Sequence, residues 1–145
     1  MLLDPIIARL TVEVPDLINR VEGAAELSEL VKRGDLPQET PAAFVLPLGL
    51  RGGEGEASAG AYTQTVEETV AVILVLEAAG EATGARALPK LDELIGQVID
   101  ALCGWAPAGE IGVFRLESGN LVSLSAGSVI YQLNFSIAEQ IRIVT

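Results

Sequence analysis

The chain has 145 residues, of which 50% are apolar, and its nine lysines and arginines against twenty aspartates and glutamates give a formal net charge of −11. This length and composition predict one folded domain over residues 1–145 and exclude a disordered chain. The acidic balance disfavours specific nucleic-acid binding, because like charges repel the phosphate backbone. No secretion signal is expected, because Leu2 and Leu3 are followed at once by Asp4 and Pro5, with no positively charged start that leads into an apolar run. No membrane span is expected either, because the longest apolar run, from Val70 to Leu76, is far shorter than the roughly 20 residues that a bilayer requires.

Two short helices are predicted in the first quarter of the chain. Asp4 and Pro5 suit a helix start, Pro15 ends this helix, Gly23 precedes the second helix and Gly34 ends it. Apolar residues recur at helical spacing in both, at Leu3, Ile6, Ile7 and Leu10 and then at Leu27, Leu30 and Val31. Residues 16–23, between the helices, fit either a helical turn or a short extended piece.

The middle of the chain predicts two strands separated by a loop. A compact apolar strand runs from Ala42 to Leu46 and is closed by Pro47. Residues 49–60 are rich in glycine and lack apolar periodicity, so we expect a flexible loop there. From Tyr62 to Glu77 the pattern predicts a long strand whose inner half is apolar on both faces. Such a strand needs a second layer, from another part of the fold or from another subunit.

The strongest helical pattern is a central amphipathic helix from Leu88 to Trp105. Pro89 suits its first position and Gly104 its end. Its apolar face comprises Leu91, Leu94, Ile95, Val98, Ile99 and Leu102, and this face requires a sheet on which to pack. We expect Trp105 to close the end of the core and Cys103, the only cysteine, to be buried.

The last third of the chain predicts three strands. One runs from Ile111 to Glu117, a turn is expected at residues 118–120, and a second strand runs from Leu121 to Ser125. The last strand alternates between an apolar side, from Val129 to Ile137, and a polar side that includes Gln132 and Asn134. The order of elements predicts an α+β fold, with a mainly antiparallel sheet on which the central helix and the short N-terminal helices pack.

The sequence contains few residues suited to catalysis or to metal binding. It has no histidine, which removes the commonest general base and neutral metal ligand, and one cysteine cannot build a zinc site. The acidic pairs Glu67-Glu68 and Asp92-Glu93 diverge on a strand and on a helix, so neither converges on a substrate atom. The glycine-rich stretch lacks the lysine of a phosphate-binding loop. We therefore expect no catalytic residue, no cofactor and no metal, and a role in binding other proteins.

Several short segments of the sequence resemble those of one protein family. They are P-A-A-F-V-L-P-L-G from Pro41, the glycine-rich stretch, the long strand from Tyr62, L-C-G-W-A-P from Leu102, and the closing pattern Gly119, Leu121, Leu124, Gly127, Tyr131 and Phe135. In this order, over nearly the whole chain, they resemble bacteriophage tail terminator proteins, which also occur in prophages and gene transfer agents.

The resemblance implies a ring, usually hexameric, that caps the head-proximal end of the tail tube. Such a ring stops polymerisation of the major tail tube protein and docks a head-completion protein. It implies a place in the virion after assembly in the host cytoplasm, with DNA passing through the ring, and no catalytic residue.

For contacts with other subunits or with the tube, we expect Arg51, Glu54 and Glu56 in the loop and Gln132 and Asn134 on the last strand. Two alternatives remain open. The chain could be another head-tail connector or tail-completion protein. From a different class, it could be a small-ligand-binding or metal-dependent α+β enzyme that uses carboxylates, for which tight stoichiometric metal binding would argue.

Overall fold

The computed structural model describes residues 3–37, 39–77, 87–109, 112–125 and 127–144. Its helices are α1 (Leu3–Glu13), α2 (Ala24–Arg33) and α3 (Ala87–Leu102), with one 3-10 turn, η1 (Pro15–Leu17). Its strands are β1 (Val21–Glu22), β2 (Ala42–Ser58), β3 (Ala61–Glu77), β4 (Arg115–Ser125) and β5 (Ser128–Val144). Within the described residues they form one five-stranded sheet in the order β1-β2-β3-β5-β4. Only the β1-β2 pair is parallel, so the predicted α+β fold with a mainly antiparallel sheet is confirmed.

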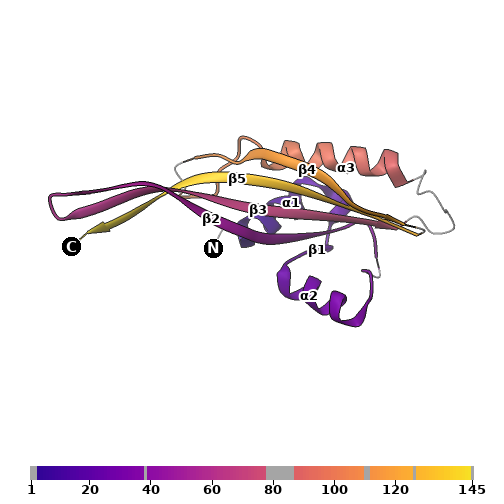
Figure 1. Ribbon diagram of the computed structural model, residues 1–145. Coiled ribbons are helices and arrows are strands. Elements are labelled where there is room, and N and C mark those ends of the chain that lie inside the picture. Colours follow the sequence, from indigo (N-terminus) through magenta and orange to yellow (C-terminus); the bar gives the residue numbers. More distant parts are fainter. Residues whose placement is uncertain (1–2, 38, 78–86, 110–111, 126, 145) are drawn as a thin grey trace.

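Helices cover both faces of one end of the sheet (Figure 1). We call the side with α1 and α3 the α1/α3 face and the opposite side the α2 face. On the α1/α3 face, Val70, Val72 and Leu74 of β3 are buried in the main core. On the α2 face, Val75 and Phe44 form a smaller cluster against which Leu27 and Leu30 of α2 pack. The second layer that the doubly apolar strand required is thus supplied, at this end, by the chain itself.

The central helix α3 lies over the sheet with the apolar side that the sequence predicted. Leu91, Leu94, Val98 and Leu102 are buried, and Ile95 and Ile99 pack at the margin of the core. The helix begins at Ala87 and ends at Leu102, so the predicted end at Trp105 is wrong. Gly104, with φ +79°, turns the chain, and Trp105 then stacks on Phe114 with ring centres 5.9 Å apart. Cys103 is half-buried rather than buried.

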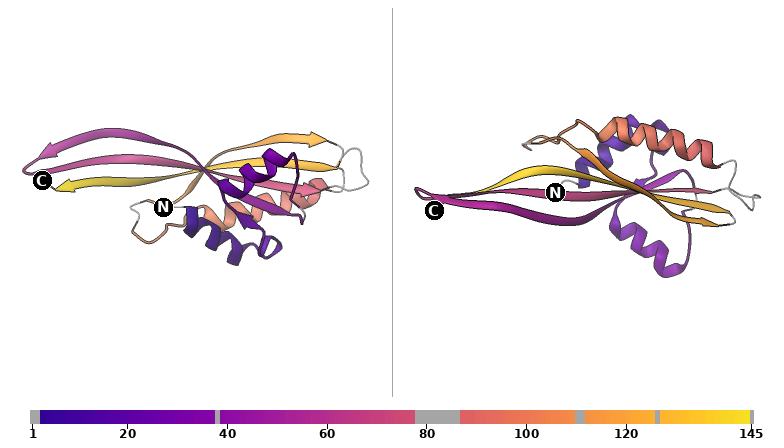
Figure 2. Two further views of the ribbon diagram at one scale, coloured as in Figure 1. Left: turned by 90° about the horizontal axis from the view of Figure 1, so that it is seen from below. Right: turned by 45° about the horizontal axis from the view of Figure 1, so that its top comes forward.

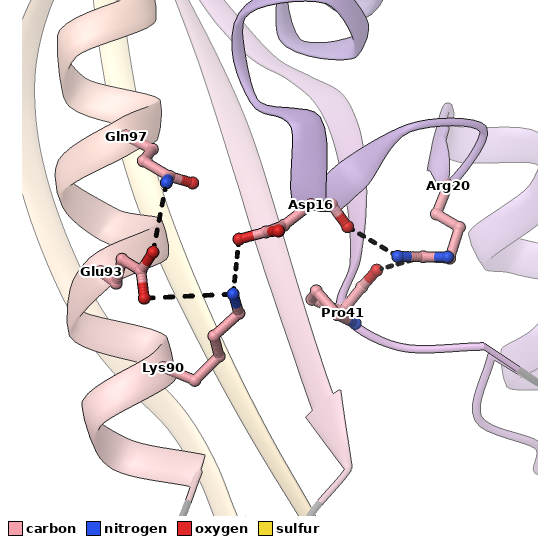
Figure 3. Close-up of polar contacts among 6 residues, drawn as sticks. All are labelled: Asp16, Arg20, Pro41, Lys90, Glu93 and Gln97. Atoms are coloured by element: carbon pink, nitrogen blue, oxygen red, sulfur yellow. Dashed lines mark hydrogen bonds and ion pairs between the residues drawn. The ribbon is translucent and has the colours of Figure 1, made fainter.

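Polar contacts join the N-terminal segment to α3 and to Pro41, the residue before β2 (Figure 3). The Asp16 carboxylate of η1 accepts a hydrogen bond from Lys90, in the first turns of α3. The Asp16 carbonyl accepts one from Arg20 at 2.6 Å, and Arg20 also donates to the Pro41 carbonyl at 2.8 Å. The segment at residues 16–23, which fitted either a helical turn or an extended piece, contains both: the end of the 3-10 turn η1 and the short strand β1.

The predicted loop at residues 49–60 is wrong. β2 does not stop at Pro47 but continues through bulges between Pro47 and Gly49 and between Gly52 and Gly55, and pairs with β3 as far as Ser58. Only Ala59 and Gly60, with φ of 45° and 81°, form the turn. Glycines that looked like loop residues are strand residues here, because bulges absorb the irregular spacing.

The turn predicted at residues 118–120 is also wrong, because β4 is continuous and passes Gly119 opposite Leu133 with bulges on either side. A Cβ on Gly119 would lie 2.8 Å from the Tyr131 hydroxyl, so this glycine makes room for a cross-strand side chain. The last strand also extends beyond its predicted end at Ile137, to Val144.

Three strands project beyond the helices as a narrow arm (Figures 1 and 2). We define the arm as residues 49–58 of β2, 61–68 of β3 and 138–144 of β5, in which β3 is the central strand and pairs with both of the others. The described C-terminus lies at its tip, beside the β2-β3 turn (Figure 2).

Candidate functional site

The acidic pairs weighed as catalytic groups do not converge. Glu67 and Glu68 lie on opposite faces of β3, and Glu67 pairs with Arg115 at 3.2 Å. Glu93 approaches Lys90 at 4.0 Å, on the exposed side of α3. In the part of the chain that the structure describes, no three cysteine or acidic side chains are grouped so that they could hold a metal ion.

A hollow of about 430 Å³ lies between α2 and the first residues of β2. Leu30 and Phe44 are among its apolar lining residues, and glutamates, including Glu26 and Glu39, are among its charged ones. Two of its glutamates make contacts within the chain. Glu26 accepts a hydrogen bond from the Gly23 N–H at 3.1 Å, and Glu39 pairs with Arg20 at 3.4 Å. The hollow is a surface depression, and part of its charged lining is paired within the chain.

The residues predicted to make contacts fall on two parts of the sheet. Arg51, Glu54 and Glu56 are exposed on the arm portion of β2, Glu54 within a bulge. Gln132 and Asn134 lie on β5 in the body of the molecule. Cross-strand register places Arg51, Glu56, Gln132 and Asn134 on the same side of the sheet, the α2 face.

The arm is held together by side chains that lie over its glycines. A Cβ on Gly55 would fall 2.1 Å from the Tyr62 hydroxyl, and one on Gly52 would fall 2.7 Å from the Gln64 amide nitrogen. Tyr62 donates a hydrogen bond to Gln64 at 3.0 Å, and Gln64 in turn donates to the Gly53 carbonyl at 2.8 Å. The glycines therefore leave space for β3 side chains to pack on the backbone of β2, and the arm is a formed sheet in the monomer.

The polar side of β5 has an internal hydrogen-bond network. Gln132 donates to Asn134 at 2.9 Å, and Asn134 donates to the Ser118 hydroxyl of β4 at 3.0 Å. Further along the strand, the fully buried Ser136 donates to Glu117 and accepts from Arg115 at 3.0 Å. The Ser136 hydrogen bond, and after it the charge of Arg115, hold the pKa of Glu117 below its ordinary value. The predicted residues Gln132 and Asn134 are thus ordered before any partner binds.

An apolar strip on the arm was missed in the sequence. Leu50, Ile141 and Ile143 lie on the α1/α3 face beyond the helices, with 69%, 39% and 52% of their surfaces exposed. The signal was present, because the alternation of the last strand continues through Ile141 and Ile143, past the end that we predicted. At the base of this strip, burial and the neighbouring Glu139 carboxylate raise the pKa of Glu68.

A folded arm with exposed apolar residues on it suits a protein that assembles with others. Comparison of the whole sequence with protein families identifies the family to which the chain belongs. The family model described as phage tail terminator protein matches residues 1–145. The chain belongs to the phage tail terminator family.

Membership of this family gives the protein a structural role in the phage tail, in the virion, and an association with other phage tail and head proteins. No curated protein matches the sequence. Among the described residues, no helix combines the length and apolar character that crossing a bilayer requires.

Proposed function

We propose that the chain forms a ring, of six copies as is usual for the family, that caps the head-proximal end of the tail tube. There it stops addition of the major tail tube protein and offers its outer surface to a head-completion protein. The match to the terminator family over all 145 residues is the observation that carries this proposal. The ring is assembled in the host cytoplasm and remains in the virion, and the chain acts as one domain with no catalytic residue, cofactor or metal.

Termination needs only unequal ring faces. One face copies the contacts that a tube subunit offers to the ring below it, and the other lacks those that recruit the next ring. The net charge of −11 supports this role, because an acidic channel wall does not hold DNA that passes through it.

For the contacting surfaces we propose the arm, with Arg51, Glu54 and Glu56, and the α2 face of β5, with Gln132 and Asn134. The arm residues are exposed, and within the described residues none of the three takes part in an ion pair. Their charges are therefore available to a partner. The β5 residues are already fixed by hydrogen bonds, so a partner meets them without an ordering cost.

Polymerisation of purified tube protein, measured with and without the chain, tests the proposed function. We expect the chain to shorten the tubes in a dose-dependent way and to appear at one end only in electron micrographs. Replacement of Arg51, Glu54 and Glu56 by alanine should weaken capping. Unchanged capping by this triple variant would show that the arm charges do not contribute to the interface. Unchanged tube length in the presence of the wild-type chain would show that the chain does not cap tubes.

A further inference from the structure

Both edges of the arm lack a strand partner within the described residues. β1 pairs with β2 only at Ala43 and Phe44, so β2 is an edge strand from there to its tip. β4 pairs with β5 only between Ser128 and Ser136, so residues 138–144 of β5 form the opposite edge. Unpaired edges expose rows of backbone donors and acceptors that pair readily with a strand of another chain.

The two edges carry opposite charges at the same level. Glu56 of β2 and Arg142 of β5 are both cross-strand partners of Thr63, so they lie on the same face and flank the central strand. In the described part of the chain neither takes part in an ion pair. Both strands are antiparallel to β3 and therefore run in the same direction, toward the tip.

We propose that β2 of each arm pairs in parallel with β5 of the arm of a second copy of this chain, with Glu56 beside Arg142 of that copy. This rests on the proposed ring, in which all arms point the same way, and it names the surfaces that close the ring. Each junction uses one edge of each kind, so every copy satisfies both of its edges when the ring closes. On the other face, the same register places Ala57 beside the exposed Ile143 of the neighbour.

Charge favours this pairing over a symmetric one. Two β2 edges would leave both β5 edges open and would bring together strands that each have two bulges. Two β5 edges would leave both β2 edges open. Only the β2-β5 pairing in this register sets a carboxylate beside a guanidinium and also uses every edge.

A disulfide between copies tests the register. The test uses the double variant Ala57→Cys with Ile143→Cys, made in a Cys103→Ser background. Within one chain, positions 57 and 143 are at the same level on opposite edges of the arm, with β3 between them. Two strand spacings, about 9.5 Å, exceed the roughly 7 Å limit for a disulfide, so the bond can form only between chains. Mild oxidation, with and without the tube protein, should give a ladder of linked chains up to the ring. The matched control, Ser58→Cys with Ile143→Cys, keeps Glu56 and Arg142, points the two thiols to opposite faces and should give no ladder.

Charge reversal tests the ion pair in the same assay. Glu56→Arg or Arg142→Glu places like charges together and should lower the ladder yield roughly tenfold, and the double reversal should restore it. Lys32→Glu, an equivalent charge reversal on the exposed surface of α2 and away from the arm, should leave the yield unchanged. Circular dichroism confirms that each variant is folded.

The outcomes separate this inference from the proposed function. Rings in electron micrographs without a ladder, or a ladder equally strong in the control pair, would overturn the edge pairing and leave the capping function intact. A ladder that is insensitive to both reversals would overturn the Glu56–Arg142 contact. The capping function is tested separately, by tube length in the polymerisation assay, and the cross-linking assay does not measure tube length.

Discussion

The guanidinium of Arg9 donates a hydrogen bond from Nε to the carbonyl oxygen of Ala101, 2.9 Å away. The carbonyls in the last turn of a helix lack partners in the helix itself, and Arg9 of α1 supplies one for α3. The same guanidinium lies 5.1 Å from the ring centre of Trp105 and 3.5 Å from the Glu13 carboxylate. One side chain therefore joins the first helix to the end of the central helix.

Arg9→Ala should lower the free energy of unfolding by about 1–2 kcal/mol, because it removes a charged hydrogen bond to a helix end and a cation–π contact. Urea denaturation followed by tryptophan fluorescence measures this, since Trp105 is the only tryptophan. Arg33→Ala is the control. Its ion pair with Asp35 is well exposed and should contribute less than about 0.5 kcal/mol. Equal effects of the two substitutions would contradict the role of Arg9.

Gly55→Ala should loosen the arm, because the new Cβ would fall 2.1 Å from the Tyr62 hydroxyl and displace that ring. Gly49→Ala is the matched control, with nothing within 4 Å of its new Cβ, and it should be neutral or slightly stabilising. Hydrogen exchange of the amides in residues 61–68 should accelerate in the first variant only. Equal protection in both variants would show that Tyr62 does not depend on the space above Gly55.

Ser136→Ala should raise the pKa of Glu117 toward its ordinary value, because the Ser136 hydrogen bond is the main cause of its depression. A depressed carboxyl pKa stabilises the fold above the ordinary value, and this contribution is lost as the pH falls through the depressed one. The wild type should therefore lose stability over that acid range more steeply than the variant. NMR titration of the Glu117 carboxyl measures the shift, and Ser118→Ala, which removes a hydroxyl bonded to Asn134 and not to Glu117, should leave it unchanged.

Glu68→Gln should stabilise the protein at pH 7, because burial, and then the Glu139 charge, oppose the ionised form of Glu68. A carboxyl whose pKa is raised in the folded state weakens the fold above that pKa. The penalty disappears as the pH falls through the raised pKa toward the ordinary value. Urea denaturation at pH 7 and pH 4 should show an advantage of the variant that shrinks on acidification, and a constant advantage would exclude titration as its cause.

Periodic apolar residues made much of the fold predictable. The faces of α1, α3, β3 and β5 follow directly from spacing, because a buried stripe on a helix or a strand has a fixed period. The need for a second layer over β3 was also visible, and α2 supplies it through Leu27 and Leu30. Helix ends were less exact, because Trp105 belongs to the core by its contact with Phe114 and not by helical continuation.

The arm could not be predicted, because its order comes from contacts across strands. Residues 49–58 look like a loop by composition, and their role as a strand depends on Tyr62 and Gln64 lying over the glycines. Local propensity favoured flexibility, and tertiary pairing overrode it. The Glu56–Arg142 relationship was hidden for the same reason, since it depends on the register of two strands that are far apart in the chain.

Tail length in the phage or prophage that encodes this chain, measured by electron microscopy after removal of its gene, tests the central claim most directly. The proposed function predicts overlong tail tubes without attached heads, and restoration of a uniform length when the chain is supplied in trans. Filled heads together with separate tails of normal length would contradict it and would identify the chain as a connector on the head side.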